Sequence, residues 1–366
     1  MRNRGLTALT LALIFTALSA GPSNAATVLY PNLRTLPPRD LRFDDVSLNG
    51  QTHRVLRFTN TVWNAGPGWL EVRGQIDPNT LTGPAIQRVY DTAGGFSDYT
   101  VGQFQYHAAH HHYHFDNWGR YELWTKADYD AWISSGGTAG SPMIGTKTTS
   151  CILDDEFVRQ LPRQPYPGVY TANGCLPDAN WQMLQGISPG WGDTYRYSRA
   201  EQWIDLGPGG SLSNGSYVLR SVTDPQNKIY ESAGRSDLTR EGDQANAAIT
   251  SFAIRQGRLV DSHSPSGSVM INNIAAATTN PVVTVKVLGR DDVSGVTKVK
   301  LSNDGTTWSK PQPYTGSGST PESISWDLTD PAYGGTSAHG TKTAYVEFKD
   351  ASGKWSGAKT DTIELN

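Results

Sequence analysis

The chain reads Tyr106-His107-Ala108-Ala109-His110-His111-His112-Tyr113-His114-Phe115-Asp116-Asn117-Trp118 at one point, and this stretch holds five of its eight histidines. In an extended segment, successive side chains alternate faces, so His110, His112 and His114 share one face while His111 and Tyr113 share the other. Residues two apart in a strand lie roughly 6.5 to 7 Å apart, which lets three imidazoles reach one ion. A helix would pair these histidines only at i,i+4 and give two-ligand sites.

We therefore predict a strand that binds a metal ion through His110, His112 and His114. Imidazole suits both Zn(II) and Cu(II), and the spacing does not choose between them. His107 and His111 are left as supporting or surface residues. The competing interpretation is an unusual histidine-rich loop without a metal.

The composition predicts a mainly β protein with two domains. Only 18% of the residues are charged, while the chain has 38 Gly, 21 Pro, 11 Trp and 16 Tyr, which is typical of turn-rich β structure. A chain of 366 residues can form two ordinary domains. Alternating and β-branched segments predict strands at residues 54–62, 69–72, 120–124, 202–206, 216–222 and 247–254, with a short helix at 126–133.

The composition and the hydrophobic pattern of the sequence change after residue 258. A polar linker, 259–267, is followed by short alternating segments in 268–366, and about 100 residues of this kind without a long helix suggest a β-sandwich. The expected domains are thus residues 26–258 and 268–366. The stretch 302–309 resembles the immunoglobulin-like or fibronectin-like modules of exported microbial enzymes, which implies an accessory domain with a cell wall, a glycan or a protein as its ligand.

The first residues predict export. Arg2 and Arg4 precede an apolar run and then Gly21 to Ala25, the three parts of a secretory signal, so we expect cleavage after Ala25 and an extracellular protein. The apolar run is too short to span a bilayer, and no other segment is long enough. Removing residues 1–25 takes away two positive charges, so the formal net charge changes from −3 to −5. This mild acidity argues against nucleic acid as a partner.

Export also makes a disulfide between Cys151 and Cys175 the expected state, because an oxidising compartment joins a pair of cysteines more often than it leaves two thiols. Nucleophilic hydrolysis is poorly supported, since the chain has no GxSxG motif and its only cysteines are expected to pair. A phosphate-binding loop is absent, because the glycine-rich residues 207–210 lack the Lys-Ser/Thr end.

Four ordered blocks resemble the catalytic domain of the lysyl oxidase family. They are the histidine stretch 107–118, then residues 145–155, 185–195 and 202–205, and weaker likeness continues at 214–219, 224–225 and 231–232. The resemblance covers roughly residues 28–255. It implies a copper amine oxidase with a quinone cofactor made from its own side chains.

Carried over position by position, the resemblance makes His110, His112 and His114 the copper ligands. It makes Lys147 and Tyr195 the residues that join to form lysine tyrosylquinone. The implied substrates are O₂ and a primary amine such as peptidyl-lysine. The reaction also needs a base, and Asp193 is our hypothesis because positions 193 and 195 share a face in a strand. Asp116, Asp154 and Asp155 are the other acidic candidates.

The chain departs from the animal members in having only two cysteines and a longer interval between Lys147 and Tyr195. The resemblance therefore does not carry over collagen or elastin as a substrate. Without it, Lys147 would be taken for an ordinary exposed lysine and Tyr195 for one of 16 tyrosines. The alternative function is a secreted metal-binding adhesion or carbohydrate-binding protein without catalysis.

Overall fold

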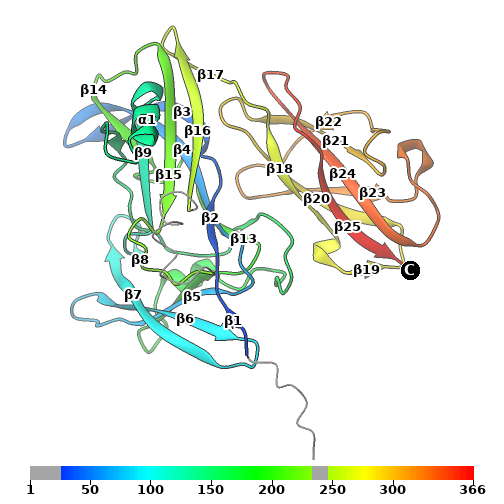
Figure 1. Ribbon diagram of the computed structural model, residues 1–366, viewed down its shortest axis with the longest axis horizontal. Coiled ribbons are helices and arrows are strands. Elements are labelled where there is room, and N and C mark those ends of the chain that lie inside the picture. The colour runs from blue at the N-terminus through cyan, green and yellow to red at the C-terminus, as the bar shows by residue number, and fades with distance from the viewer. Residues whose placement is uncertain (1–25, 233–245) are drawn as a thin grey trace, which may run out of the picture.

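The computed structural model describes residues 26–232 and 246–366, which form two mainly β parts lying side by side (Figure 1). The predicted fold class is confirmed. The predicted secretory signal, residues 1–25, lies outside the described residues. Across the described ranges no helix has the length and apolar character needed to cross a membrane.

The first part contains three sheets. One has the order β12 (Gln182–Ile187), β5 (Leu70–Gln75), β6 (Thr82–Asp91), β7 (Phe96–His107), β8 (His112–Phe115), with β1 (Val28–Leu29) beside β6. The second has the order β10 (Met143–Ile144), β9 (Gly119–Thr125), β15 (Gly215–Thr223), β16 (Ala247–Arg255), β17 (Arg258–Val260). The third has the order β11 (Glu156–Phe157), β13 (Trp191–Tyr195), β4 (Gln51–Asn64), β14 (Trp203–Pro208), with β2 (Leu33–Thr35) and β3 (Arg39–Leu48) also paired to β4.

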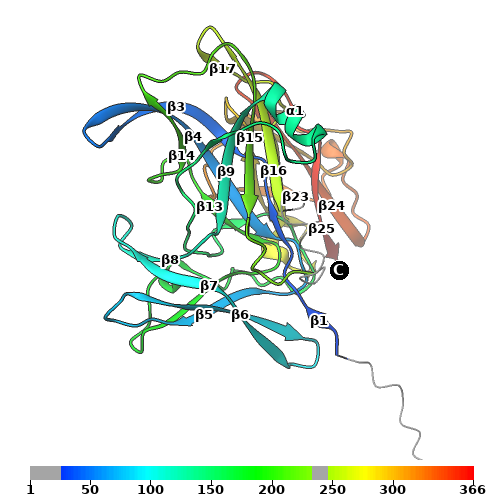
Figure 2. The ribbon, with the colours of Figure 1, turned by 60° about the vertical axis from the view of Figure 1, so that its left-hand side comes forward.

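Strand β4 links two hydrophobic cores. Its Val62 packs in a core that also contains Phe104 and Trp118, while its Leu56 and Phe58 pack in another. Figure 2 shows the sheet of β5 to β8 as a layer beneath the strands β4, β9, β13, β15 and β16. The histidine hairpin therefore lies at the edge of one layer and can face the other.

The second part consists of two sheets packed face to face. The smaller has the order β18 (Ser266–Ile271), β20 (Val282–Arg290), β23 (Glu322–Asp327), and the larger has the order β19 (Ala277–Thr278), β25 (Lys359–Leu365), β24 (Gly340–Asp350), β21 (Val296–Ser302), β22 (Gln312–Pro313). In β24 buried residues alternate with more exposed ones, as expected for a strand with one face in a core. Val285 and Val346, from opposite sheets, share that core.

Helical structure is scarce among the described residues. The predicted helix is present as α1 (Lys126–Ser134), and it begins where the Thr125 side chain accepts a hydrogen bond from the backbone N–H of Asp128. Short 3₁₀ turns occur at η1 (Ala172–Cys175), η2 (Asn272–Ile274) and η3 (Pro331–Tyr333). The strands predicted from residue 54 to residue 254 outside the histidine stretch all have counterparts. The predicted linker 259–267 is shorter, because β17 ends at Val260 and β18 begins at Ser266.

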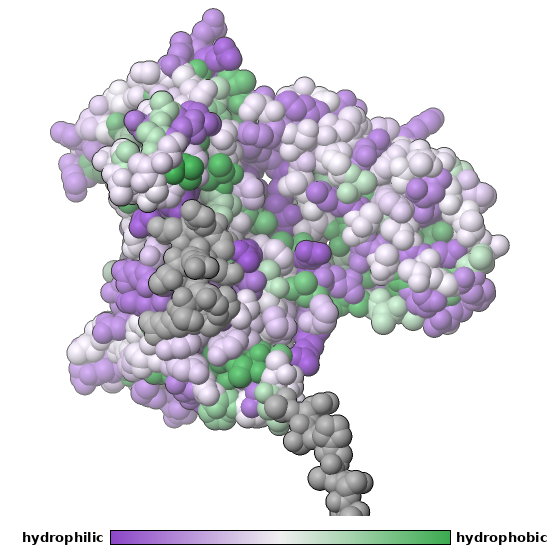
Figure 3. Space-filling model, viewed as in Figure 1, coloured by the Kyte–Doolittle hydropathy of each residue, from purple (hydrophilic) through white to green (hydrophobic). Residues whose placement is uncertain are grey.

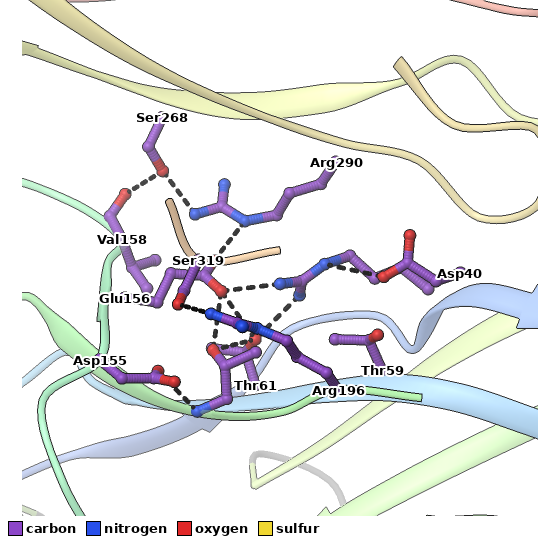
Figure 4. Close-up of polar contacts among 12 residues, drawn as sticks. Asp40, Thr59, Thr61, Asp155, Glu156, Val158, Arg196, Ser268, Arg290 and Ser319 are labelled. Atoms are coloured by element: carbon purple, nitrogen blue, oxygen red, sulfur yellow. Dashed lines mark hydrogen bonds and ion pairs between the residues drawn. The ribbon is translucent and has the colours of Figure 1, made fainter. Parts of the chain in front are cut away.

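A buried ion cluster fastens the two parts together (Figure 4). The carboxylate of Glu156 is fully buried, and it accepts hydrogen bonds from Arg39 Nη2 at 2.7 Å and from Arg290 Nε at 2.6 Å. Arg39 belongs to the first part and Arg290 to the second. Burial raises the pKa of Glu156, but the charges of Arg290 and Arg39 outweigh burial and lower it to about 2.

We expect Glu156→Gln to lower the free energy of unfolding by about 3 to 5 kcal/mol, because glutamine keeps the shape but removes the buried charge that Arg290 and Arg39 share. Among the described residues, Arg39 then keeps only its longer ion pair with Asp40, at 3.9 Å. Chemical denaturation measures this change. The pKa of Glu156 is lowered in the folded state, so its contribution is complete above about pH 4.5 and is lost as the pH falls towards 2. Asp98→Asn is the control, since it breaks only the surface pair with Arg88. Its expected cost is about 0 to 1 kcal/mol, and equal losses in the two variants would contradict the prediction.

Candidate active site

The histidine stretch forms a hairpin. Strand β7 ends at His107, residues 108–111 turn, and β8 begins at His112, which pairs with His107. The backbone N–H groups of His110 and His111 both donate to the carbonyl of His107, and His111 has a positive φ of 57°. The prediction of one continuous strand through His110, His112 and His114 is therefore wrong at His110, which lies in the turn. Only His112 and His114 share a strand face.

The turn nevertheless brings the three imidazoles together. His114 Nε2 lies 3.2 Å from His110 Nδ1 and 3.0 Å from His112 Nε2. The other nitrogen of His114, Nδ1, is 2.8 Å from the hydroxyl of Thr149, which fixes the ring and directs Nε2 towards the other two histidines. Two of the predicted ligands thus have a ring nitrogen beside His114 Nε2. The three histidines whose ring nitrogens all lie within 4.8 Å of one another, however, are His107, His110 and His114, without His112.

The surroundings keep these rings neutral. Burial, and after it the positive charge of Lys147, lower the pKa of His110 to about 4 and that of His114 to about 2. The pKa of His112 is lowered by the same two causes. A neutral imidazole offers the lone pair that a metal ligand needs.

The two histidines left outside the predicted ligand set differ from each other. The His107 ring stacks on His114 with centroids 4.6 Å apart, and a ring nitrogen of His107 can lie within 4.8 Å of nitrogens of His110 and His114. His107 Nε2 is 3.6 Å from a carboxylate oxygen of Glu201. His111 is exposed. Sequence reasoning missed the place of His107, although a four-residue turn at 108–111 would have put it opposite His112.

Lys147 is buried beside this cluster, with 3% of its surface exposed. Its Nζ atom has no hydrogen-bond partner among the described residues and lies 4.7 Å from the centroid of the Tyr195 ring. Burial lowers the pKa of Lys147 to about 8, against the opposing effects of Glu201 and Asp193. A large fraction of this amine is therefore neutral, and nucleophilic, at mildly alkaline pH.

Tyr195 is the last residue of β13, and its hydroxyl donates a hydrogen bond to the carbonyl of Cys151 at 2.8 Å. Cys151 is bonded to Cys175, so the predicted disulfide is confirmed and lies next to the site. Burial, and then the negative charge of Asp193, raise the pKa of the Tyr195 hydroxyl well above its usual value. The phenol is thus held neutral, with its ring facing the Lys147 amine.

Asp193 lies two residues before Tyr195 on the same strand and is 2% exposed. Its Oδ2 atom is buried and has no partner among the described residues. Burial, followed by the charge of Asp155, raises the pKa of Asp193 well above its usual range, while Lys147 opposes this effect. The Trp118 side chain, like Lys147, opposes this rise in the pKa of Asp193, an effect that the sequence did not reveal.

The other acidic candidates all accept hydrogen bonds. Asp154 accepts hydrogen bonds from the backbone and hydroxyl of Ser188 and from the backbone of Tyr170. Asp116 accepts from the backbone of Gln103 and from the Asn117 amide. Asp155 accepts from the backbone of Thr194.

One family model matches part of the chain. Residues 89–240 match the family model described as lysyl oxidase, and this range contains the histidine hairpin and Lys147, Asp193 and Tyr195. No curated protein matches the chain.

Among solved structures, the chain is similar to the tetra-tandem repeat in the extending region of a large adhesion protein, with 8% identity over 92% of this chain and 75% of that chain, at a TM-score of 0.21. It is also similar to the Spr0440 glycoside hydrolase domain, Endo-D, from Streptococcus pneumoniae R6, with 10% identity over 92% of this chain and 38% of that chain, at a TM-score of 0.18. TM-scores this low support no conclusion about fold or function.

Proposed function

We propose that this protein is a secreted copper amine oxidase that converts primary amines, such as peptidyl-lysine, to aldehydes. The observation that carries the proposal is the buried Lys147 amine, which lies 4.7 Å from the centroid of the Tyr195 ring and beside a histidine cluster. A buried lysine amine without a hydrogen-bond partner costs stability, and such groups are found more often at functional sites. Covalent attachment to the neighbouring ring would be the function of this amine.

The histidine cluster fits copper. His110, His112 and His114 would hold the ion, and His107 is close enough to support or join them. His107 Nδ1 is buried without a partner among the described residues, and so is His110 Nε2, the nitrogen of His110 that does not face His114. Bound copper would supply a Lewis acid and a redox centre for oxidising the nearby phenol.

Lysine tyrosylquinone would form from Lys147 and Tyr195, with O₂ as the oxidant. Such a quinone supplies the electron sink that lets a primary amine, water and O₂ become an aldehyde, ammonia and hydrogen peroxide. The chain's own contribution is positional. The Cys151 carbonyl holds the Tyr195 hydroxyl, and burial keeps part of the Lys147 amine neutral so that it can bond to the oxidised ring.

Proton transfer and substrate attraction would fall to two carboxylates. Asp193, with a raised pKa and an unpartnered oxygen, would accept the proton from the carbon next to the substrate nitrogen. Glu201, whose side chain is 39% exposed, lies beside His107 and would attract an ammonium group arriving from solvent. The predicted signal and the Cys151–Cys175 bond support an extracellular location, and residues 268–366 would bind a cell wall, a glycan or a protein.

The first test compares two histidines of the hairpin. We expect His114→Gln to lower copper affinity at least roughly 100-fold and to remove hydrogen peroxide production from a primary amine, because this imidazole is central to the cluster. His111→Gln should retain both properties, since His111 is exposed in the turn. Copper content and amine-dependent peroxide are measured on copper-loaded, aerated protein. A copper-loaded native chain that yields no peroxide from any primary amine would leave only the non-catalytic metal-binding function.

A further inference from the structure

Three carboxylates outside the histidine site meet where the two parts of the molecule join. Asp261 lies in the short connection between β17 and β18, and Asp291 and Asp292 directly follow β20. One oxygen from each can lie within 4.8 Å of the others. Asp291 and Asp292 are only 5% and 8% exposed, so this is a buried group of like charges rather than a solvated acidic surface.

In each of the three carboxylates, one oxygen is engaged and the other is not. Asp261 Oδ1 accepts a hydrogen bond from Lys354 Nζ at 2.9 Å, and Asp292 Oδ2 lies 2.7 Å from His263 Nδ1. Asp291 Oδ2 accepts from the backbone of Ser294 and Gly295, each at 2.8 Å.

The opposite oxygens, Asp261 Oδ2, Asp291 Oδ1 and Asp292 Oδ1, are all buried and have no partner among the described residues. Buried polar atoms normally have a partner, so three orphans in one cluster point to a missing ligand.

The nearby charges leave the cluster negative. Asp350 adds a fourth carboxylate, with an oxygen 3.8 Å from Lys354 Nζ, and Lys354 is the lysine that pairs with both Asp261 and Asp350. His263 adds positive charge only if it is protonated. Four carboxylates against one lysine leave a formal charge of −3 with His263 neutral.

We propose that Asp261, Asp291 and Asp292 bind a calcium ion that stabilises the junction between the two parts. Carboxylate oxygens are hard ligands, which Ca²⁺ prefers and which suit copper poorly. Calcium binds oxygens at roughly 2.3 to 2.6 Å, so two ligands on opposite sides of one ion are about 5 Å apart, and one oxygen of each of these three carboxylates lies within 4.8 Å of the others. Water would complete the coordination.

The same residues join the two parts through their backbone. The carbonyl of Asp291 accepts from the N–H of Asp40 at 3.1 Å, and that of Asp292 accepts from Leu41 at 2.7 Å, both in β3. A cavity of about 1090 Å³ at this junction is lined by residues of both parts, including His263, Asp291 and Asp292. Figure 3 shows that the surface is indented where the two parts meet.

The test measures thermal unfolding of the full chain after dialysis against EDTA, with and without millimolar calcium chloride. We expect calcium to raise the Tm by on the order of 5 °C, because an ion that binds only the folded state stabilises it. Asp292→Asn should lose this rise. Asp130→Asn, the same change at an exposed carboxylate paired with Lys126, should keep it.

Asp261→Asn is the second variant, because its residue lies in a connecting segment and its loss is less disruptive to folding. Calcium titration calorimetry of both variants should show one fewer binding site than the native chain. The proposal is overturned if calcium leaves the native Tm unchanged, or if both Asp→Asn variants respond as strongly as the native chain. The outcome does not depend on amine oxidation, since the histidine site is not altered.

Discussion

Lys147→Ala is expected to lower amine-dependent hydrogen peroxide production by roughly three orders of magnitude or more, because the residue would be part of the cofactor itself. The Lys147 amine is buried over the Tyr195 ring, and alanine offers no atom that could bond to that ring. Tyr195→Phe should have the same effect, since a ring without its hydroxyl is far harder to oxidise to a quinone. Activity is measured as peroxide from a primary amine.

Mass spectrometry provides the direct measurement of the bond. In the native, copper-loaded and aerated chain, the peptides that contain Lys147 and Tyr195 should be covalently joined, and neither variant should show this product. Because burial lowers the pKa of Lys147 to about 8, the fraction of neutral amine grows as the pH rises through 8, and the joined product should form faster.

Lys126→Ala is the matched control, because Lys126 is a half-exposed lysine paired with Asp130 on helix α1. This variant should keep both the peroxide activity and the joined peptides. If Lys147→Ala retained activity, or if the native peptides were never joined, the proposed cofactor would be wrong. Copper could still bind the histidines in that case.

The regular strands were predictable because their signal is local. In β24, for example, the side chains that enter the core recur at every second residue, so the pattern is visible in the sequence itself. The Cys151–Cys175 bond was equally accessible, since two cysteines allow one pairing. The hairpin turn could not be predicted, because residues 108–111 contain no glycine, proline or asparagine. In addition, His111 adopts a positive φ that few non-glycine residues adopt.

Local sequence patterns could not predict which distant residues come together in the site. Nothing in the residues around Lys147 marks this lysine as buried, and no spacing rule pairs it with Tyr195; only the resemblance to lysyl oxidases connected them. The ion pair at the junction of the two parts could not be predicted from the sequence either. Glu156 and Arg290 are 134 positions apart, and their contact depends on how two separate sheets pack. Contacts of this kind follow from the whole fold.

Asp193→Asn is expected to lower turnover by roughly 10² to 10⁴-fold while leaving the joined Lys147–Tyr195 peptides in place, because a general base contributes about that much. Asparagine fills the same space but cannot accept the proton. The loss should fall on kcat rather than KM, since a base acts in the transition state. Asp116→Asn is the control, because Asp116 is engaged by Gln103 and Asn117, and it should stay within a few-fold of the native rate.

The pH profile separates a base from a residue that only supports the fold. Burial and the charge of Asp155 raise the pKa of Asp193. Activity should therefore rise with pH and level off, and the midpoint of this rise should lie well above the pKa range of an exposed aspartate. Asp155→Asn removes the charge of Asp155 and should move the midpoint to lower pH. If Asp193 only supported the fold, this substitution would not shift the midpoint. Unchanged turnover in Asp193→Asn would exclude this carboxylate as the base, and Asp155, whose pKa burial and Glu156 raise to about 7, would then be the residue to replace.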